Sequence, residues 1–546
     1  MKNKASLKWI IGNSRPVIPF LFLSTVISAA ASGCMVLLTY VGKQVVDIAT
    51  GSFSGNFFSK IFLLVVIVVL ELILQVIYSR LSIVISGKME MGIKTNIFRK
   101  LLKKDISMVY RYHSGELLNR MTADAHIITN AFTNIVPAVV SLTTRLIGAF
   151  AMLFWLDGTF ALIYLVSGPI FLAVTRIYSV KMKTLHKKCQ ESDGSVKAFI
   201  QEAIANILVI KAFENEQPVS DEAYKLQLTN YKYKVKRNAI SIVANIFVFI
   251  AFTFGYYLAL GWGAYKLSKG LITVGTLTAM LQLVSQVQTP FKNLSGIIPQ
   301  YYQAIASVER ILELENLKED TDGLKKECLY DFYSKANKII FDNITFSYDE
   351  RHTIIKDFSY EINIGDFVAI CGISGIGKST LLKLLLGVIK PQQGKIYLVL
   401  NDGKQIEIDD KTRALFSYVP QGNMILSGTI GDNIRFFNSE LSDEDVMKAC
   451  SLARIDDFIS SLPRGLNTVI GEHGIGLSEG QVQRVAIARA LISQAPVILL
   501  DEATSALDEK TEKEFLEGLK TIESKTCLIV SHKQTTLSAC DKKIVF

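Results

Sequence analysis

Residues 366–386, which read DFVAICGISGIGKSTLLKLLL, carry the clearest chemistry in this sequence. They contain the pattern G-x-x-x-x-G-K-S from Gly372 to Ser379, between an apolar run that resembles a buried strand and a leucine-rich run with helical spacing. Glycines let consecutive backbone N–H groups turn inward around a phosphate, and the start of the following helix adds its positive dipole end. The pattern predicts a loop that holds the phosphates of a nucleotide.

The side chains of this loop have separate expected roles. Lys378 reaches the β- and γ-phosphates, and the Ser379 hydroxyl binds Mg²⁺. The other loop positions expected to contact the nucleotide are Gly372, Ser374, Gly375, Gly377 and Thr380. A glycine-rich turn that matches by chance is the alternative, and the flanking strand and helix count against it.

A second group of acidic residues follows the apolar run 497–500, where Asp501 and Glu502 stand side by side. At the end of a buried strand, downstream of a phosphate loop, Asp501 is expected to bind Mg²⁺ directly or through water. Glu502 lies one residue further on and is expected to polarise the attacking water. The loop and the strand end together predict hydrolysis of ATP with Mg²⁺ as the metal cofactor.

The composition indicates a membrane half followed by a globular half. The chain has 546 residues, too many for one core, and 50% of them are hydrophobic, with the excess in the N-terminal part. The net charge of +9 arises largely from basic residues in 88–120 and 176–237, between apolar segments, as in cytoplasmic loops of membrane proteins. No basic–aromatic motif accompanies the charge, so we expect no nucleic-acid partner. Seven scattered cysteines without a C-x-x-C pair indicate reduced thiols.

Six apolar segments are long enough to cross a bilayer as helices. They cover residues 16–41, 59–85, 132–156, 159–180, 240–265 and 272–298. Lysine and arginine before the first segment place the N-terminus in the cytoplasm, and an even number of crossings places the phosphate-binding half there too. The inner connections, 86–131 and 181–239, are long and charged, which predicts that the spans continue as helices beyond the bilayer.

Polar side chains within the spans are costly and need a reason. Glu71 and Arg145 fall near the middle of the second and third spans, where they either line a polar pathway or pair between helices. Gln282, Gln286 and Thr289 share one face of the sixth span. We expect this stripe to face a transport pathway, with interhelical hydrogen bonding as the alternative.

The polar, acidic stretch 316–336 marks a linker between a membrane domain, residues 1–315, and a soluble domain, residues 337–546. Strand-like segments at 339–348, 358–364, 497–500 and 527–530 alternate with helical stretches. This order predicts an α/β fold built on a mainly parallel sheet.

Between the phosphate loop and the acidic strand end lies Leu477-Ser478-Glu479-Gly480-Gln481. With this motif the chain resembles the ATP-binding cassette (ABC) transporter family, and specifically its exporter-type half-transporters, over essentially its whole length. The resemblance implies an α-helical membrane domain of six transmembrane helices with long cytoplasmic extensions, followed by an α/β P-loop NTPase cassette. It also implies ATP-driven export in an alternating-access cycle.

The resemblance further implies roles for single residues. Ser478, Gly480 and Gln481 look like the signature residues that bind the ATP held by the opposite cassette. Gln421 is similar to the glutamine that senses Mg²⁺, and Tyr348 to the aromatic residue that stacks on adenine. Asp508 ends a loop similar to the one that links the two ATP sites, and His532 resembles the histidine that contacts the γ-phosphate. The stretches 110–124 and 195–216 resemble the segments that dock on the cassettes.

The implied assembly is a dimer of two copies in a bacterial-type cell membrane, with the N-terminus and cassette in the cytoplasm. Glu479 stands where glycine is commonest in the signature, which leaves a pairing with a related half-transporter open. The chain ends at Phe546, inside an expected strand, which suggests a shortened cassette or a truncated chain. An importer with the exporter fold and an ATP-gated channel or sensor are alternatives. Peptides, lipids and amphipathic drugs are all compatible cargoes.

Overall fold

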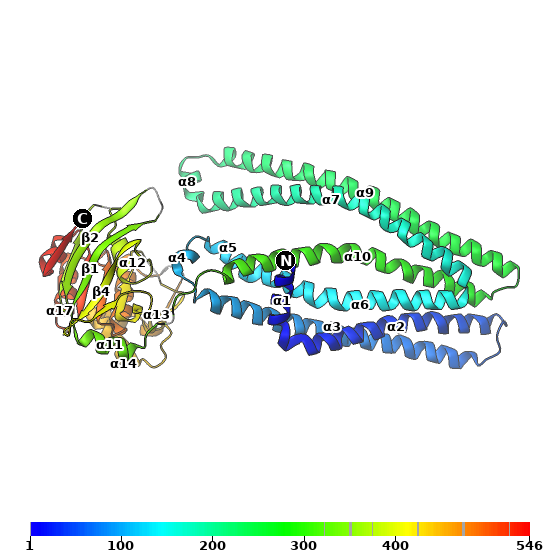
Figure 1. Cartoon of the computed structure of the whole chain (residues 1–546), viewed down its shortest axis with the longest axis horizontal. Helices are drawn as coiled ribbons and strands as arrows, with labels where there is room; N and C mark the ends of the chain where they lie inside the picture. The colour runs from blue at the N-terminus through cyan, green and yellow to red at the C-terminus, as the bar shows by residue number, and fades with distance from the viewer. Residues whose placement is uncertain are drawn as a thin grey trace. The chain divides into compact units, whose positions relative to one another are not determined.

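The computed structural model of this chain describes residues 2–321, 323–348, 352–373, 375–422, 425–471, 476–522 and 525–546. The chain forms two compact units, which are coloured along the sequence in Figure 1. The membrane unit consists of Met1–Arg99 and Gly115–Glu315, and the cassette unit of Lys100–Ser114 and Asn316–Phe546. The domain limits at residues 315 and 336 stay a prediction.

In its described part the membrane unit consists of helices and short connections, without a strand. Its long elements are α1 (Lys2–Ser14), α2 (Ile18–Ala49), α3 (Phe57–Leu101), α6 (Ala125–Leu156), α7 (Gly158–Ala205), α9 (Glu216–Ser268) and α10 (Val274–Glu315). Its short elements are η1 (Arg15–Val17), α5 (Ser114–Asn119), the π-helical turn η2 (Arg120–Asp124) and α8 (Ile207–Ala212).

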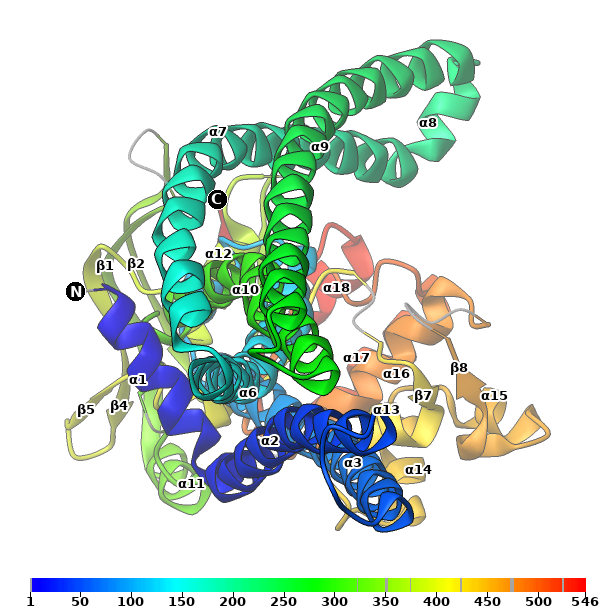
Figure 2. The same ribbon diagram turned by 90° about the vertical axis from the view of Figure 1, so that its right-hand side faces the viewer.

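Four helical segments of the described residues are long and apolar enough to cross a membrane: Ala5–Ala49, Phe57–Leu101, Ser114–Leu156 and Glu216–Ser268. Of the other two predicted spans, 159–180 lies within α7, and 272–298 overlaps α10, which begins at Val274. The predicted continuation of the spans as helices is confirmed for α3, which runs on to Leu101, and for α7, which runs on to Ala205. Short non-helical stretches at 102–105, 110–113 and 213–215 interrupt these connections. Figure 2 shows α8 at the tip of the hairpin formed by α7 and α9.

Two apolar clusters hold these helices together. One joins α6, α7, α9 and α10 through fully buried side chains that include Leu153, Phe160, Ala259, Met280 and Leu283. The other joins α1, α3, α6 and α10 through Ile10, Ile85, Met89, Ile93, Ile97, Ile128 and Ile311. On α3, by contrast, most side chains between Phe57 and Ile83 are exposed, as on a helix that faces lipid.

A buried charged cluster surrounds the π-helical turn η2. Arg120 donates to Glu116 at 2.7 Å and to Glu313 on α10 at 3.0 Å. Asp124, which is 1% exposed, accepts from Ser307 at 2.8 Å and pairs with Arg310, both on α10. Paired and hydrogen-bonded charges of this kind tolerate burial. They tie the start of α6 to the C-terminal end of α10.

The sixth-span stripe is not arranged as predicted. Gln286 is buried, and its Nε2 donates to Thr39 Oγ1 at 2.8 Å and to Met35 O at 3.2 Å, both on α2. Its expected position on a transport pathway is therefore wrong, and the alternative of interhelical hydrogen bonding holds for this residue. Gln282 is exposed and Thr289 is half-buried. The open polar side of α10 consists of Thr278, Gln282, Ser285 and Thr289.

Glu71 and Arg145 form no ion pair in the part of the chain that the structure describes. The Glu71 carboxylate accepts from Gln75 Nε2 at 3.1 Å. Arg145 Nε is buried without a hydrogen-bond partner. The pairing that the sequence left open is therefore not observed among these residues.

The cassette unit contains two main sheets. The first is parallel, with the order β11-β3-β10-β9-β6. Its strands are β3 (Phe367–Cys371), β6 (Phe416–Val419), β9 (Val497–Asp501), β10 (Thr526–Val530) and β11 (Lys542–Val545). This confirms the predicted parallel α/β sheet. Its strands β9 and β10 are buried along their whole length, because helices cover both faces of such a sheet.

The second sheet is antiparallel, with the order β2-β1-β4-β5. Its strands are β1 (Ala336–Ser347), β2 (Thr353–Asn363), β4 (Gln393–Leu400) and β5 (Gln405–Glu407). A short pair, β7 (Gly428–Thr429) and β8 (Val469–Ile470), lies elsewhere in the cassette. The cassette helices are α12 (Lys378–Leu385), α13 (Ile430–Arg435), α14 (Asp443–Leu452), α15 (Asp456–Ser461), α16 (Glu479–Ile492), α17 (Glu509–Lys520) and α18 (Gln534–Ala539), with short 3-10 turns η3 (Arg413–Leu415) and η4 (Gly465–Asn467).

Part of the predicted linker packs on the cassette. Helix α11 (Lys326–Ser334) places Leu329 and Tyr333 in the core of this unit. The preceding linker residues pair with the chain just after α3, which leads into α4 (Ile106–Val109): Asp105 N donates to Lys318 O, and Asp320 N donates to Lys103 O, both at 2.9 Å. These bonds join the connection after the second span to the connection after the sixth.

Candidate functional site

The phosphate loop connects β3 to α12 as the sequence predicts. Gly372, Gly375 and Gly377 have φ angles of 149°, 83° and 116°, a region where side chains cause strain. A Cβ at Gly377 would also lie 2.8 Å from the Ile354 side chain. Because α12 begins directly at Lys378, its unpaired N–H groups point toward the loop. Ser374, another predicted contact, lies outside the described residues.

Lys378 lies across this loop. Its Nζ donates to the carbonyl oxygens of Gly372 at 2.9 Å and Ile373 at 3.0 Å. Beside the start of α12, the Tyr348 hydroxyl is 3.4 Å from Thr380 Oγ1, and its ring packs edge-on against Phe346. Tyr348 is 59% exposed. An exposed aromatic ring next to a phosphate loop is suited to stack on a nucleotide base.

Asp501 ends β9 and is 1% exposed. Ser379 Oγ donates to its Oδ1 at 2.9 Å, and the Tyr418 hydroxyl donates to its Oδ2 at 3.1 Å. Burial raises the pKa of Asp501, whereas the hydrogen bonds from Ser379 and Tyr418 lower it. Burial also raises the pKa of Tyr418, and the neighbouring Asp501 adds to this effect. The tyrosine therefore stays a neutral donor that holds the carboxylate in position.

Glu502 lies next to this carboxylate with an unusual backbone. Its φ of 52° is rare for a residue other than glycine and is typical of functional sites. Its N–H donates to Val530 O at 3.1 Å. Gln421 Nε2 donates to Glu502 Oε2 at 2.7 Å, and His532 Nε2 lies 3.9 Å from Oε1. Residues from the ends of β6, β9 and β10 thus meet at one edge of the parallel sheet.

The signature residues occupy another part of the cassette. Ser478 caps α16: its Oγ accepts from Gln481 N at 3.3 Å, while Gln481 Oε1 accepts from Ser478 N at 2.8 Å. At Gly480 a Cβ would lie 3.0 Å from Ala506 O, so any residue other than glycine would require this carbonyl to shift. Asp508 caps α17 and accepts from Thr511 N at 3.0 Å. Within the described residues no hydrogen bond joins the signature to the phosphate loop.

Sequence reasoning missed a buried carboxylate behind the site. Glu512 on α17 is 0% exposed and accepts hydrogen bonds from the hydroxyls of Thr504, Thr535 and Thr536. Lys533 Nζ donates to Thr504 O at 2.9 Å and Leu507 O at 2.6 Å. These bonds join the loop that follows Glu502 to the loop that carries His532. Single hydroxyls and a lysine scattered over 33 positions leave no recognisable motif.

The residues around Asp501 fit a bound metal and nucleotide. Hydroxyl, carboxylate and amide oxygens from Ser379, Asp501 and Gln421 are the hard ligands that Mg²⁺ takes together with phosphate oxygens. Among the described residues no cluster of three His, Cys, Asp or Glu side chains indicates another metal site. The sheet edge is therefore suited to bind a nucleotide triphosphate and to direct water at it.

Comparison with known proteins agrees with this chemistry. Residues 21–291 match the family model of the ABC transporter transmembrane region, and residues 355–505 match the ABC transporter model. A putative export ATP-binding/permease protein of Rickettsia felis is 30% identical over 465 residues, which are 83% of this chain and 78% of that protein. The ATP-dependent lipid A-core flippase of Photobacterium profundum is 28% identical over 465 residues, 84% of this chain and 78% of that protein.

The fold has a counterpart among solved structures. A bacterial Atm1-family ABC exporter with ATP bound superposes with a TM-score of 0.82 at 24% identity, covering 97% of this chain and 93% of that chain. The phosphate loop, the acidic strand end and these matches agree over both units. The chain therefore belongs to the ABC transporter family, as an exporter-type half-transporter whose helical membrane domain is fused to an ATP-hydrolysing cassette.

Proposed function

We propose that two copies of this chain form an ATP-driven exporter of a lipid or another amphipathic molecule, with the N-terminus and the cassettes in the cytoplasm. The observation that carries the proposal is the meeting of Ser379, Asp501 and Glu502 at one sheet edge. This edge hydrolyses ATP, and the helices that continue from the spans transmit the resulting movement.

Each residue of the edge has a defined task in this proposal. Lys378 and the loop N–H groups bind the phosphates, while Asp501 and Ser379 would hold Mg²⁺, which would neutralise charge on the phosphate oxygens. Glu502 takes the proton of the attacking water, and Gln421 orients that carboxylate through its 2.7 Å hydrogen bond. His532, whose Nε2 lies 3.9 Å from Glu502 Oε1, would donate to the γ-phosphate. Tyr348 stacks on the base.

The proposed dimer explains two features of a single copy. Ser478 caps α16, and Gly480 packs against Ala506 in the 505–508 loop. Among the described residues, no hydrogen bond joins these signature residues to the phosphate loop of their own chain. The tip of the α7–α9 hairpin exposes Leu208 and Phe213, which are 79% and 72% exposed. A second copy would complete each ATP site with its signature and cover this apolar tip.

The proposed cargo class rests on α10 and on the relatives. Thr278, Gln282, Ser285 and Thr289 form an open stripe of uncharged polar groups at helical spacing on an otherwise apolar helix. Such a stripe suits a substrate with both polar and apolar parts. Several relatives are named ATP-dependent lipid A-core flippases, which act on an amphipathic lipid. A heterodimer with a related half-transporter is the second arrangement that Glu479 leaves open.

Transport into sealed proteoliposomes tests this function. The purified protein is reconstituted with fluorescent lipid analogues. ATP is added outside the vesicles, so that only molecules with their cassettes on the outer surface of the vesicle are active. We expect ATP-dependent movement of the lipid to the inner leaflet, and no movement with Glu502→Gln. Movement of the lipid only down its concentration gradient would indicate a gated channel. ATP-dependent movement of the lipid to the outer leaflet would indicate an importer.

A further inference from the structure

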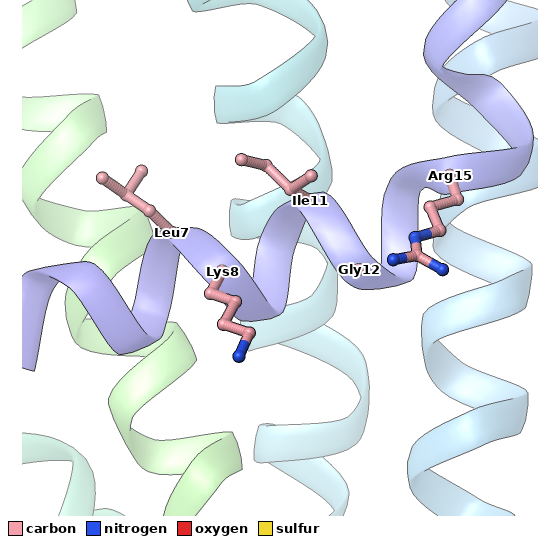
Figure 3. Close-up of a pocket in the computed structure, with 5 residues that line it drawn as sticks. All are labelled: Leu7, Lys8, Ile11, Gly12 and Arg15. Atoms are coloured by element: carbon pink, nitrogen blue, oxygen red, sulfur yellow. The ribbon is translucent and has the colours of Figure 1, made fainter.

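The N-terminal helix α1 and the first residue of the adjoining turn η1, Arg15, carry a basic stripe that the transport function does not use. Lys8, Gly12 and Arg15 lie at positions i, i+4 and i+7, and with Leu7 and Ile11 they line a shallow hollow of about 390 Å³. Figure 3 shows α1 running across the neighbouring helices, with Lys8 and Arg15 extending to one side and Leu7 and Ile11 to the other. The hollow thus has a basic side and an apolar side.

The opposite face of α1 fixes this orientation. Ile10 is buried in the cluster with α3, and Ser14 Oγ lies 3.7 Å from Met89 Sδ on that helix. Asn96 Nδ2 on α3 donates to Asn13 Oδ1 at 2.9 Å, and Trp9 Nε1 donates to Glu315 Oε2 on α10 at 3.0 Å. With this face tied down, the basic stripe stays on the surface.

The contacts with α3 also set the depth of α1 in the bilayer. The apolar segment of α3 ends near residue 85, and Met89 lies four residues further on, about 6 Å along the helix. The headgroup region on each side of the hydrocarbon is about 5–8 Å thick. Ser14 therefore lies near the level of the inner-leaflet headgroups. Because α1 runs across the neighbouring helices, Lys8 and Arg15 lie near the same level, with Leu7 and Ile11 on the other side of α1 (Figure 3).

No carboxylate neutralises this stripe. The sequence contains no Asp or Glu before Asp47. In the described residues Lys8 and Arg15 form no ion pair, whereas Glu315 is engaged by Trp9, and Glu90 by Lys94 and His126. Gly12 lies between the two cations, one helical turn from each of them. A Cβ at this position would meet no atom within 4 Å. An anion can therefore approach the helix backbone between them.

We propose that Lys8 and Arg15 bind the phosphate of an anionic inner-leaflet phospholipid, such as phosphatidylglycerol, with Gly12 leaving room for the headgroup and Leu7 and Ile11 contacting its chains. The bound lipid is a fixed partner, separate from any transported molecule on α10. Each cation near an anionic lipid surface increases binding by about fivefold, so the pair should favour phosphatidylglycerol over phosphatidylcholine by about 30-fold.

Lipid binding to the full-length protein in detergent, counted by intact mass, tests this site. Delipidated protein is titrated with phosphatidylglycerol and phosphatidylcholine of identical chains. We expect a saturable phosphatidylglycerol site, with the preference lost in Lys8→Gln/Arg15→Gln. Gly12→Leu fills the hollow without changing charge and should reduce binding at least tenfold. Lys232→Gln, which removes an exposed charge on the distant α9, should leave binding unchanged.

Two further measurements distinguish a fixed phospholipid from a free phosphate and from a transported lipid. Inorganic phosphate and the headgroup without chains should compete weakly, since Leu7 and Ile11 then contribute nothing; equal competition would assign the stripe to a free phosphate instead. Trapping with ATP in Glu502→Gln should not change the bound lipid, whereas a transported lipid would respond. Unchanged preference in both Lys8→Gln/Arg15→Gln and Gly12→Leu, with both proteins monodisperse and hydrolysing ATP, would overturn the proposal.

Discussion

Glu502 is the residue on which the proposed hydrolysis depends. Its carboxylate is held by Gln421 at 2.7 Å, next to a carboxylate bound to the phosphate-loop serine. Glu502→Gln keeps the shape and removes the base, so turnover should fall by about 100-fold or more while ATP binding remains. Steady-state hydrolysis and nucleotide binding measure the two effects. Near wild-type hydrolysis in the variant would remove Glu502 from this role.

Glu512 tests whether the buried contacts behind the site matter for turnover. An amide NH₂ cannot accept from a hydroxyl, so Glu512→Gln should break at least one bond between the loops that follow Glu502 and His532, costing about 1–3 kcal/mol. We expect kcat to fall several-fold with KM for ATP little changed, and the melting temperature to fall by about 5 °C. Kinetics at several ATP concentrations and a thermal scan check this.

The matched control for Glu512 is Glu509→Gln, an exposed glutamate on the same helix. It should change neither kcat nor melting temperature. If Glu512→Gln lowers the melting temperature alone, the residue only stabilises the cassette. A fall in kcat that Glu512→Asp partly restores supports a positioning role.

The sequence could predict the residues that act within one continuous motif. The phosphate loop and the Asp501–Glu502 pair follow from local patterns, because each lies at a strand end whose apolar run is visible in the chain. Tyr418 and Lys533 escaped prediction. Their partners depend on which strands are neighbours: Tyr418 reaches Asp501 only because β6 pairs with β9.

At the scale of elements, α10 offers a test of which face lines the pathway. Single cysteines at 282 and 285, on its open side, should react with a water-soluble thiol reagent and become protected when ATP closes the cassettes. Positions 284 and 286 are buried against neighbouring helices and should react slowly in both states. Labelling of a protein whose seven native cysteines are replaced measures this. Equal labelling of all four positions would remove this face from the pathway.

The same helix, α10, shows a limit of prediction from sequence periodicity. On a helical wheel Gln282, Gln286 and Thr289 share one face, but the wheel does not show where the contact of α10 with a neighbouring helix begins. Gln286 lies about 40° from Gln282 on such a wheel, and that rotation is enough to bring it to Thr39 on α2. Likewise, the antiparallel sheet around β1 was not predicted, since its β4 partner lies more than 45 residues away in sequence.

At the scale of the whole molecule, we predict that each ATP site needs two copies, because the signature residues are not bonded to the phosphate loop of their own chain among the described residues. A chain with Lys378→Ala retains its signature, and a chain with Ser478→Arg retains its phosphate loop. Co-expressed, the two inactive chains should form mixed dimers that contain one complete site and recover part of the ATPase activity. Purification through two different tags isolates these dimers for measurement.

The reciprocal pairing separates shared sites from sites within one chain. A wild-type chain paired with a Lys378→Ala/Ser478→Arg chain has no complete site if sites are shared, but has one if each cassette works alone. Occluded ATP in a Glu502→Gln background counts complete sites even when turnover requires both. We expect one occluded ATP in the first pairing and none in the second, because the signature residues of a chain are not bonded to its own phosphate loop. The reverse pattern would show that each cassette binds ATP by itself and would contradict the shared site.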